Sequence, residues 1–441
     1  MLGVIKRNAV VLSMVFTAII LVWVSANLKW GDERWNNIIG VDGNGYYAYL
    51  PAIFIYHDLS FGFFDDLSKD ENRTDLSYNY RIKIGDKTIN KYFAGTALAQ
   101  LPFFGMGHFT NWLTGNPLDG YSVYYLIFIQ VATLFYALLG MYFLMRILRM
   151  YKVSEWVNTL VIFSVMFGTS VFHYVVDSPS MSHIYSFAFV NLFVFSFLNF
   201  FKKPSIRFLL LAMFAFGMIV LIRPVNGLVI LSLPFLSGSS MKLKIGLHYL
   251  MKHPLQFVLA LFPAFLLIMV QLIIYKIQTG HFLVYSYGKE SLDFFNAQMW
   301  KFLFSYRKGF FVYTPVFILS LFGSWYFLKK SFFQFISWFA FLAIVVFVLS
   351  SWWQWYYGGS FGSRVMIEYY VFFAIPLALL LQKNRYRKVI AVVVVLFIFV
   401  CQIQIYQYRY GYLHWSEMNK ERYWDNFLRI DKVLNGDEKE W

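Results

Sequence analysis

The chain has 441 residues, of which 59% are hydrophobic and 22% aromatic, and its mean hydropathy is +0.55. This composition excludes a soluble globular domain, because apolar segments long enough to cross a bilayer dominate the chain. The net charge of +15 does not indicate a nucleic-acid partner, since the basic excess lies in short loops between apolar segments. The single cysteine, Cys401, excludes a disulfide within the chain.

Apolar segments predict an all-α polytopic membrane protein with about eleven transmembrane helices, ten to twelve being compatible with the pattern. Residues 207–222 and 225–237 are short and flank Arg223-Pro224, so we interpret them as one broken hairpin. The first segment follows Lys6 and Arg7 without a convincing cleavage site, which indicates an uncleaved signal anchor. The predicted segments are 9–26, 121–145, 154–174, 184–201, 207–222, 225–237, 254–275, 310–328, 332–350, 365–381 and 389–406.

The distribution of basic residues gives the orientation. With Met1 inside, the inner segments contain 17 of the 38 basic residues and one acid, Glu155. The positive-inside rule therefore predicts a cytoplasmic N-terminus and an extracytoplasmic C-terminus. The other 22 acids fall outside, so carboxylate chemistry is expected on the outer face. The inner basic residues are Lys6, Arg7, Arg146, Arg149, Lys152, Lys202, Lys203, Arg207, Lys242, Lys244, Lys252, Lys329, Lys330, Lys383, Arg385, Arg387 and Lys388.

The first outer loop, 27–120, contains eleven acids but also two apolar stretches, 46–57 and 94–113. A full crossing at 94–113 would invert every later loop and place the basic loops outside. Both stretches are therefore predicted to be interfacial helices on the outer surface. Between them, 78–92 alternates around Gly85-Asp86, which predicts a small hairpin.

Three more segments are predicted outside: the loops 276–309 and 351–364, and the tail 407–441. The tail carries aromatic side chains among charges, which predicts a short helix on the surface. The organisation is thus a transmembrane domain over 1–406 and a short extracytoplasmic tail over 407–441.

Asp42 lies in Gly40-Val41-Asp42-Gly43-Asn44-Gly45. Two interpretations stay open. Asp-Gly and Asn-Gly pairs favour a simple turn. Alternatively, flexible backbone holds a carboxylate at the water–lipid boundary, where a general base could reach an acceptor hydroxyl.

Asp58 is the second candidate carboxylate, and a helix-end position is its structural alternative. If 46–57 were helical, its twelve residues would separate Asp58 from Asp42 by about 18 Å. The two acids would then not form a paired-carboxylate site. Asp65, Asp66, Asp70, Glu71 and Asp75 are interpreted as a solvated run.

Four basic residues border apolar spans on the outer face, where the charge rule disfavours them: Arg223, Arg307, Lys308 and Arg364. Such cations can extend to lipid headgroups. Several converging on one cavity would instead bind a donor phosphate, with arginine binding in a bidentate manner.

Aromatic and polar residues near these segments are candidates for contact with the substrate. Aromatic residues in a membrane protein also form interfacial belts, so a stacking surface for a sugar or an isoprenoid chain is one of two interpretations. His183, at the start of its helix, is a capping residue or a contact to acceptor or phosphate. The candidates are Tyr46, Tyr47, Lys91, Tyr92, His183, Tyr313, Trp355 and Tyr356.

The chain resembles the GT-C superfamily of polytopic glycosyltransferases, and most nearly the protein O-mannosyltransferases, the lipid A aminoarabinose transferases and their uncharacterised bacterial relatives. The similarity covers most of the chain through about residue 410. The matching residues are Gly40-Val41-Asp42-Gly43, Lys91-Tyr92-Phe93-Ala94-Gly95 before Pro102-Phe103-Phe104, Arg223-Pro224, Lys308-Gly309 with Tyr313-Thr314-Pro315, and the segment from Trp355 to Arg364.

The resemblance implies a GT-C-like fold in a bacterial inner membrane and a polyprenyl-phosphate sugar as donor. It implies inverting transfer to an extracytoplasmic acceptor (a lipid, a glycan or a protein), with Asp42 as general base. Many members carry an acid immediately after that aspartate, whereas this chain has Gly43. This departure leaves open a second assisting acid and a requirement for a divalent metal. No cofactor and no metal ligand is otherwise indicated.

Two other functions are alternatives. A transporter or lipid flippase usually carries ionisable residues near the bilayer centre and internal repeats, whereas the charges here lie at span ends. A polysaccharide polymerase or ligase would use prenyl-diphosphate donors and a late basic loop, a role for which 276–309 is a candidate.

Overall fold

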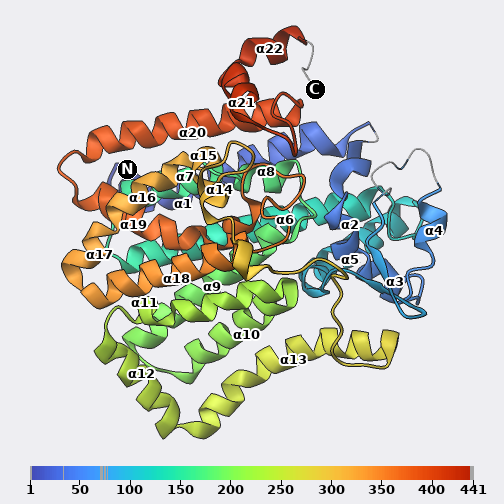
Figure 1. Cartoon of the computed structure of the whole chain (residues 1–441), viewed down its shortest axis with the longest axis horizontal. Coiled ribbons are helices and arrows are strands. Elements are labelled where there is room, and N and C mark those ends of the chain that lie inside the picture. The colour runs from blue at the N-terminus through green and yellow to red at the C-terminus, as the bar shows by residue number, and fades with distance from the viewer. Residues whose placement is uncertain (1, 33, 70–72, 74–75, 77, 438–441) are drawn as a thin grey trace.

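The computed structural model describes residues 2–32, 34–69, 73, 76 and 78–437, with side chains from residue 9 onward. The predictions for Asp70, Glu71 and Asp75, and for the side chains of Lys6 and Arg7, lie outside this description. The described chain is mostly helical, with one two-stranded sheet (Figure 1). The all-α polytopic class is confirmed.

Every predicted apolar segment is helical over most of its length. Seven helical segments are long and apolar enough to cross a membrane, and the number rises to eight if one bent pair counts as a span. These seven are α1 (Leu2–Ser25) continuing into η1 (Ala26–Trp30), α6 (Val123–Met150), α9 (Ser182–Lys202), α13 (Pro254–Thr279), α18 (Phe332–Ser350), η7 (Arg364–Tyr369) with α19 (Tyr370–Lys383), and α20 (Arg387–Arg409).

The remaining predicted spans are shorter or broken, for local reasons. The 154–174 segment divides into α7 (Glu155–Phe167) and α8 (Val171–Val176). The 207–222 segment is α10 (Ile206–Ile222), which ends directly before Arg223-Pro224. The 310–328 segment becomes α15 (Phe310–Tyr313), η6 (Pro315–Phe317), α16 (Ile318–Gly323) and α17 (Trp325–Lys330). Proline interrupts the last of these because it lacks a backbone N–H and restricts the residue before it.

The chain after Pro224 does not form a straight helix. It runs through η4 (Pro224–Ser232) and α11 (Leu233–Ser237) and then turns into α12 (Ser240–Lys252) with a bend of 119°. Gly238 lies at the bend with φ +72°, a conformation that glycine adopts at low cost. α12 carries Lys242, Lys244 and Lys252, three of the basic residues that the charge pattern assigned to the inner side.

Helices α9 and α19 form the buried centre of the bundle. α9 packs against α6 and α10, α10 packs against α13, and α19 lies against α7 and α16. Both central helices are buried over most of their length, whereas α1, α13 and α20 expose broad apolar faces. The exposed apolar faces are what a lipid environment requires of peripheral spans.

The first loop folds into a compact cap at one end of the bundle, on the right in Figure 1. It contains η2 (Arg34–Ile38), α2 (Asp42–Tyr47), α3 (Tyr49–Phe54) and α4 (Phe64–Leu67). It continues through β1 (Arg81–Ile84) and β2 (Lys87–Asn90) to α5 (Gly95–Thr114). Helices α11, α12, α16 and α17 gather at the opposite end.

The predicted hairpin is present. β1 and β2 pair antiparallel, with Ile84 opposite Lys87 across Gly85-Asp86. The stretch 46–57, in contrast, is not one surface helix. It divides between α2 and α3, and Tyr47, Tyr49 and Leu50 are buried. The predicted helical character is present in these two short helices, and their aromatic side chains pack inward.

The stretch 94–113 forms the continuous helix α5, which accommodates Pro102. Its buried residues include Gly95, Ala99 and Phe104, and its outward face exposes Met106, Phe109, Trp112 and Leu113. α5 is not among the seven span candidates. Its exposed apolar face suits the interfacial position predicted for it.

The other predicted outer segments also carry short helices. The 276–309 loop contains η5 (Phe294–Asn296) and α14 (Met299–Phe304), and the tail contains α21 (Lys420–Asn426) and α22 (Ile430–Asn435). The 276–309 and 351–364 loops pair through backbone hydrogen bonds, including Trp353 N–H to Ser291 C=O at 3.0 Å. The tail packs on both loops, since the Ser360 N–H donates to the Trp415 carbonyl and Nε of Arg307 donates to the Ser416 carbonyl.

Candidate active site

Asp42 is the first residue of α2, in a tight backbone turn. The Gly43 N–H donates to the Gly40 carbonyl at 2.9 Å, and the Asn44 N–H donates to the Val41 carbonyl at 3.1 Å. Val41, directly before Asp42, has φ +48° and is 60% exposed. A β-branched residue with positive φ is strained, and such strain persists where the surrounding fold fixes the backbone.

Gly43 leaves no room for a side chain. A Cβ atom there would lie 1.9 Å from Oγ of Ser180 and 2.7 Å from its Cβ. Ser180 comes from the turn before α9, so this close approach seats the Asp42 turn on the bundle core. The missing acid at position 43 therefore has a steric reason in this chain.

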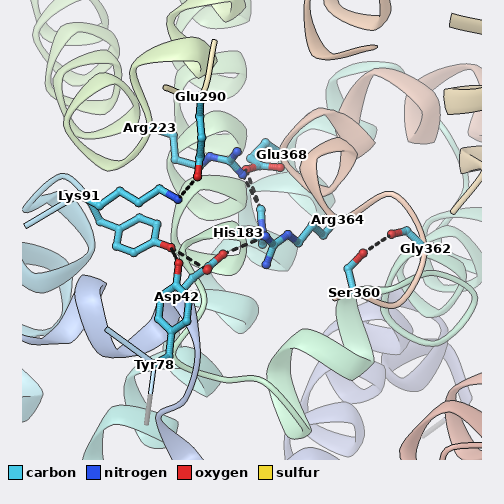
Figure 2. Close-up of polar contacts among 11 residues, drawn as sticks. Asp42, Tyr78, Lys91, His183, Arg223, Glu290, Ser360, Gly362, Arg364 and Glu368 are labelled. Atoms are coloured by element: carbon cyan, nitrogen blue, oxygen red, sulfur yellow. Dashed lines mark hydrogen bonds and ion pairs between the residues drawn. The ribbon is translucent and has the colours of Figure 1, made fainter. Parts of the chain in front are cut away.

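The Asp42 carboxylate has two side-chain partners (Figure 2). The Tyr92 hydroxyl donates to Oδ1 at 2.6 Å, and Nη2 of Arg364 donates to Oδ2 at 2.8 Å. The side chains of Asp42 and Arg364 are 15% and 13% exposed, so the ion pair is mostly buried but still accessible to solvent. Burial raises the pKa of Asp42, but Arg364, Tyr92 and Lys91 outweigh it and hold the pKa below its usual range. Asp42 is therefore ionised at neutral pH.

A second layer surrounds Tyr92. Its hydroxyl lies 3.0 Å from that of Tyr78. Nζ of Lys91 donates to Oε1 of Glu290 at 2.6 Å and lies over the rings of Tyr92 and Tyr287. Burial lowers the pKa of Lys91, but Glu290 and nearby groups outweigh it, so the pKa is raised and Lys91 stays cationic.

A closed cluster lies beside this pair, built around Glu368. Nδ1 of His183 lies 3.0 Å from both Oε1 of Glu368 and Nη1 of Arg223. Nη1 of Arg223 is 3.4 Å from the same carboxylate oxygen, and Nδ2 of Asn226 donates to it at 3.2 Å. The Glu368 side chain is 0% exposed, and its Oε2 has no hydrogen-bond partner among the described residues.

Tyr46 connects the two clusters. It packs against Tyr92 with ring centroids 4.6 Å apart and is buried. Burial raises its pKa, Arg223 opposes that shift, and Asp42 adds to it, so the phenol lies within electrostatic reach of both. The view in Figure 2 accordingly contains Asp42 and Arg364 together with Arg223, His183 and Glu368.

The other two predicted cations are already engaged elsewhere. Nζ of Lys308 donates to the Ser360 carbonyl, and its side chain is buried. Burial, with help from Arg364 and Arg307, holds the pKa of Lys308 well below its usual range. Nε of Arg307 donates to the Ser416 carbonyl at 2.6 Å, and its guanidinium lies 3.6 Å from the centroid of the Tyr356 ring. Phosphate binding by either stays a prediction without a supporting contact.

Asp58 caps a turn away from these clusters. Its Oδ1 accepts from the Ser60 N–H at 2.8 Å and its Oδ2 from the Gly62 N–H at 2.6 Å. Both contacts lie in the turn between α3 and α4, so the carboxylate has a local structural role there.

Three aromatic residues that were predicted to contact the substrate also contact other residues of the protein. The Tyr47 hydroxyl donates to the Gly120 carbonyl, and the Tyr313 hydroxyl donates to the Tyr306 carbonyl at 2.7 Å. Trp355 packs against Tyr356 with centroids 5.6 Å apart.

Four residues of the site were not predicted: Tyr78, Asn226, Glu290 and Glu368. The sequence carried one signal for Glu368, an acid four positions into an apolar segment, where an unpaired charge would be costly. Glu290 and Tyr78 lie in polar loops, where glutamate and tyrosine are common, so the sequence carried no signal for them. No group of three or more His, Cys, Asp or Glu side chains that could hold a metal gathers within the described part of the chain.

The fold is GT-C-like, as its similarity to a solved membrane protein shows. The chain is similar to the crystal structure of ArnT from Cupriavidus metallidurans bound to undecaprenyl phosphate, with a TM-score of 0.53 and 13% sequence identity. That similarity covers 91% of this chain and 65% of the ArnT chain, so this protein spans less than two thirds of that structure. No protein-family model and no curated protein matches the sequence.

Proposed function

We propose that this protein is a membrane glycosyltransferase that transfers a sugar from a polyprenyl-phosphate donor to an extracytoplasmic acceptor with inversion. The observation that carries the proposal is the pairing of Asp42 with Arg364 beside Tyr92 and Lys91, where three predicted outer segments meet: 27–120, 276–309 and 351–364. The GT-C-type fold, shared with a structure that binds undecaprenyl phosphate, supports the donor class.

In the proposed reaction Asp42 accepts the proton of the acceptor hydroxyl. The acceptor oxygen then forms a bond to the anomeric carbon as the bond from that carbon to the phosphate oxygen breaks. The phosphate leaves with the electron pair and gains negative charge. Arg364, Arg223 and Lys91 would stabilise that charge, because fixed cations act most strongly where charge develops.

The Asp42–Arg364 ion pair gives the donor a second role. A carboxylate held by a guanidinium is a weak base, because the ion pair lowers its pKa. A donor phosphate that binds Arg364 competes with Asp42 for the same guanidinium group. Once Arg364 turns to the phosphate, the pKa of Asp42 rises and the carboxylate becomes a better base. Donor binding would thus prepare the base.

The closed cluster positions Arg223 in this scheme. Glu368 and His183 contact the Arg223 guanidinium from within the bundle, and Asn226 donates a hydrogen bond to Glu368. A cation fixed before the substrate arrives loses little conformational freedom on binding.

The test is transfer of label from prenyl-monophosphate sugars, by purified protein in nanodiscs, to extracted envelope lipids, glycans and proteins. The proposal expects label in one acceptor class with monophosphate donors. Label only from prenyl-diphosphate sugars would favour the polymerase or ligase. Translocation of a labelled lipid in proteoliposomes without transfer would favour a flippase. Parallel reactions with EDTA and with Mg²⁺ or Mn²⁺ measure metal dependence.

A further inference from the structure

A small polar cavity adjoins the Asp42 turn. Its volume is about 220 Å³, and its lining includes Val41, Ser180 and Arg364 but none of Lys91, Tyr92 or Arg223. Arg364 therefore stands between the cavity and the proposed phosphate site: it lines the cavity while its Nη2 contacts Asp42. In Figure 2 the Arg364 and Ser360 side of the site lies opposite Lys91 and Tyr78.

The cavity walls suit a small hydroxylated group. Ser178, Ser180 and Ser360 line it, together with Tyr174 and Tyr408. Hydroxyls and a carboxylate can exchange hydrogen bonds with sugar hydroxyls, and aromatic rings present flat apolar surface to a sugar ring. Pockets for drug-sized ligands have volumes of about 300–1,000 Å³, so this cavity is limited to a smaller group.

The charges at the cavity are balanced. Asp177 lines it and is bound by Arg409 through two contacts, Nε to Oδ1 at 2.6 Å and Nη2 to Oδ2 at 3.1 Å. Nδ1 of His173 lies 3.2 Å from the same carboxylate. Burial raises the pKa of Asp177, but His173 and Arg409 outweigh it and lower the pKa to about 2. With Arg364 paired to Asp42, the walls favour a neutral ligand.

A larger cavity continues toward the tail. Its volume is about 500 Å³, and it is lined by the segment from Tyr408 to Gly411 and by Leu413, His414 and Trp415. The two cavities share Tyr408, and the Asp177–Arg409 ion pair joins a residue of one lining to a residue of the other. We call the cavity beside the Asp42 turn the inner cavity and the one toward the tail the outer cavity. The Asp177–Arg409 ion pair and Tyr408 separate the two.

We propose that the inner cavity binds the acceptor as a neutral, hydroxylated unit the size of one sugar residue, which enters through the outer cavity beneath the tail. The inference rests on the proposed function. Inverting displacement requires the acceptor oxygen to approach the anomeric carbon from the face opposite the leaving phosphate. Of the proposed phosphate-binding cations, Lys91 and Arg223 do not line the cavity, and Arg364 lies between the cavity and the phosphate site. An acceptor in the cavity and the leaving phosphate would therefore occupy different sides of Arg364 and Asp42, which is the arrangement that this displacement needs.

The test uses cysteine accessibility, since the native chain has only Cys401, which is buried. Ser178→Cys places a thiol in the inner cavity, and Ser68→Cys places one on the exposed end of α4 as the matched control. Each variant, in nanodiscs, is treated with a small methanethiosulfonate reagent, and the native chain is the blank. Methyl glycosides of the common hexoses and 6-deoxyhexoses are the first probes, and undecaprenyl phosphate is the second.

The expected result is that at least one methyl glycoside slows modification of Ser178→Cys fivefold or more and leaves Ser68→Cys unchanged. Undecaprenyl phosphate is expected to slow Ser178→Cys less than the glycoside does. Failure of every glycoside to protect, or equal or stronger protection by undecaprenyl phosphate, would overturn the assignment. Because protection requires no turnover, this result is separate from success or failure of the transfer assay.

Discussion

Two carboxylate–arginine pairs lie side by side in this protein, and they differ in how they meet solvent. The two arginines are similarly exposed, Arg364 at 13% and Arg223 at 14%, but Asp42 is 15% exposed whereas Glu368 is 0% exposed and also contacts the buried His183. The open pair can exchange its internal partner for a ligand at small desolvation cost. The carboxylate of the closed pair cannot, because removing its cationic partners would leave the fully buried Glu368 charge without compensation. The open pair therefore suits the proposed proton transfer, and the closed pair suits the positioning of Arg223.

The largest expected effect is at the open pair. Asp42→Asn preserves the shape of the side chain and an oxygen that can accept from Tyr92, but removes the proton acceptor. We expect sugar transfer to fall by about 10²–10⁴-fold, the contribution typical of a general base. The initial rate of label transfer measures it, with thermal unfolding as the control for folding. Unchanged turnover would remove Asp42 from the mechanism.

At the closed pair the main effect is on stability. Glu368→Ala leaves Arg223 and His183 facing a void, and breaking a buried ion pair costs about 3–5 kcal/mol. We expect a strong fall in the thermal unfolding midpoint. The matched control is Glu290→Ala, which removes the partly exposed partner of Lys91 and should cost about 0–1 kcal/mol. Equal effects of the two variants would refute the contrast between open and closed pairs.

Arg364→Gln tests the pH dependence of the open pair. Arg364 helps to hold the pKa of Asp42 below its usual range, so its removal raises that pKa. The acid limb of the rate profile, where Asp42 becomes protonated as pH falls, should move to higher pH. At neutral pH we expect about a 10–100-fold loss of transfer, in line with about 1.5–3 kcal/mol for a hydrogen bond to a charged group. An acid limb that stays in place would assign it to another group.

Gly43→Ala probes how firmly the open pair is seated. The added Cβ would collide with Ser180, and overpacking of this kind costs about 1–3 kcal/mol. Ser180→Gly removes both close atoms, so the double variant should recover stability relative to Gly43→Ala. A double-mutant cycle of thermal unfolding measures this coupling, and additive losses would contradict the contact.

The smallest effect is expected at Asp58. Its carboxylate caps a turn through Ser60 and Gly62, so Asp58→Asn should leave transfer within about twofold and lower stability by about 1 kcal/mol. Steady-state transfer rates and thermal unfolding separate the two effects. A loss comparable to that of Asp42→Asn would reinstate Asp58 as a second catalytic carboxylate.

Much of the architecture was predictable, because apolar segments of membrane length and the charge pattern are local signals. All eleven predicted segments are helical, and the Gly85-Asp86 hairpin is present. The breaks were less predictable. The 310–328 segment has the composition of one span, yet it divides at Thr314-Pro315 and again near Ser324. The 46–57 stretch has the composition of a surface helix, yet it packs into the cap.

The site was predictable only in part. Asp42 and Arg364 meet as expected, and Arg223 and His183 lie beside them. Arg307 and Lys308, which share the same signal of a cation at a span end, are held by the carbonyls of Ser416 and Ser360. Composition cannot separate these cases, because each cation has several acceptors within reach and only the packed chain selects one.

The sequence by itself determined that the chain builds a bundle of apolar helices with acid-rich loops at one end, since hydrophobic length and charge act over neighbouring residues. Only the tertiary structure decided which charges meet. Asp42 and Arg364 are separated by more than 300 positions, and Glu368 joins Arg223 and His183 from three different helical segments. Such contacts depend on the packing of whole helices, which places side chains within hydrogen-bonding distance and excludes the water that would otherwise screen them.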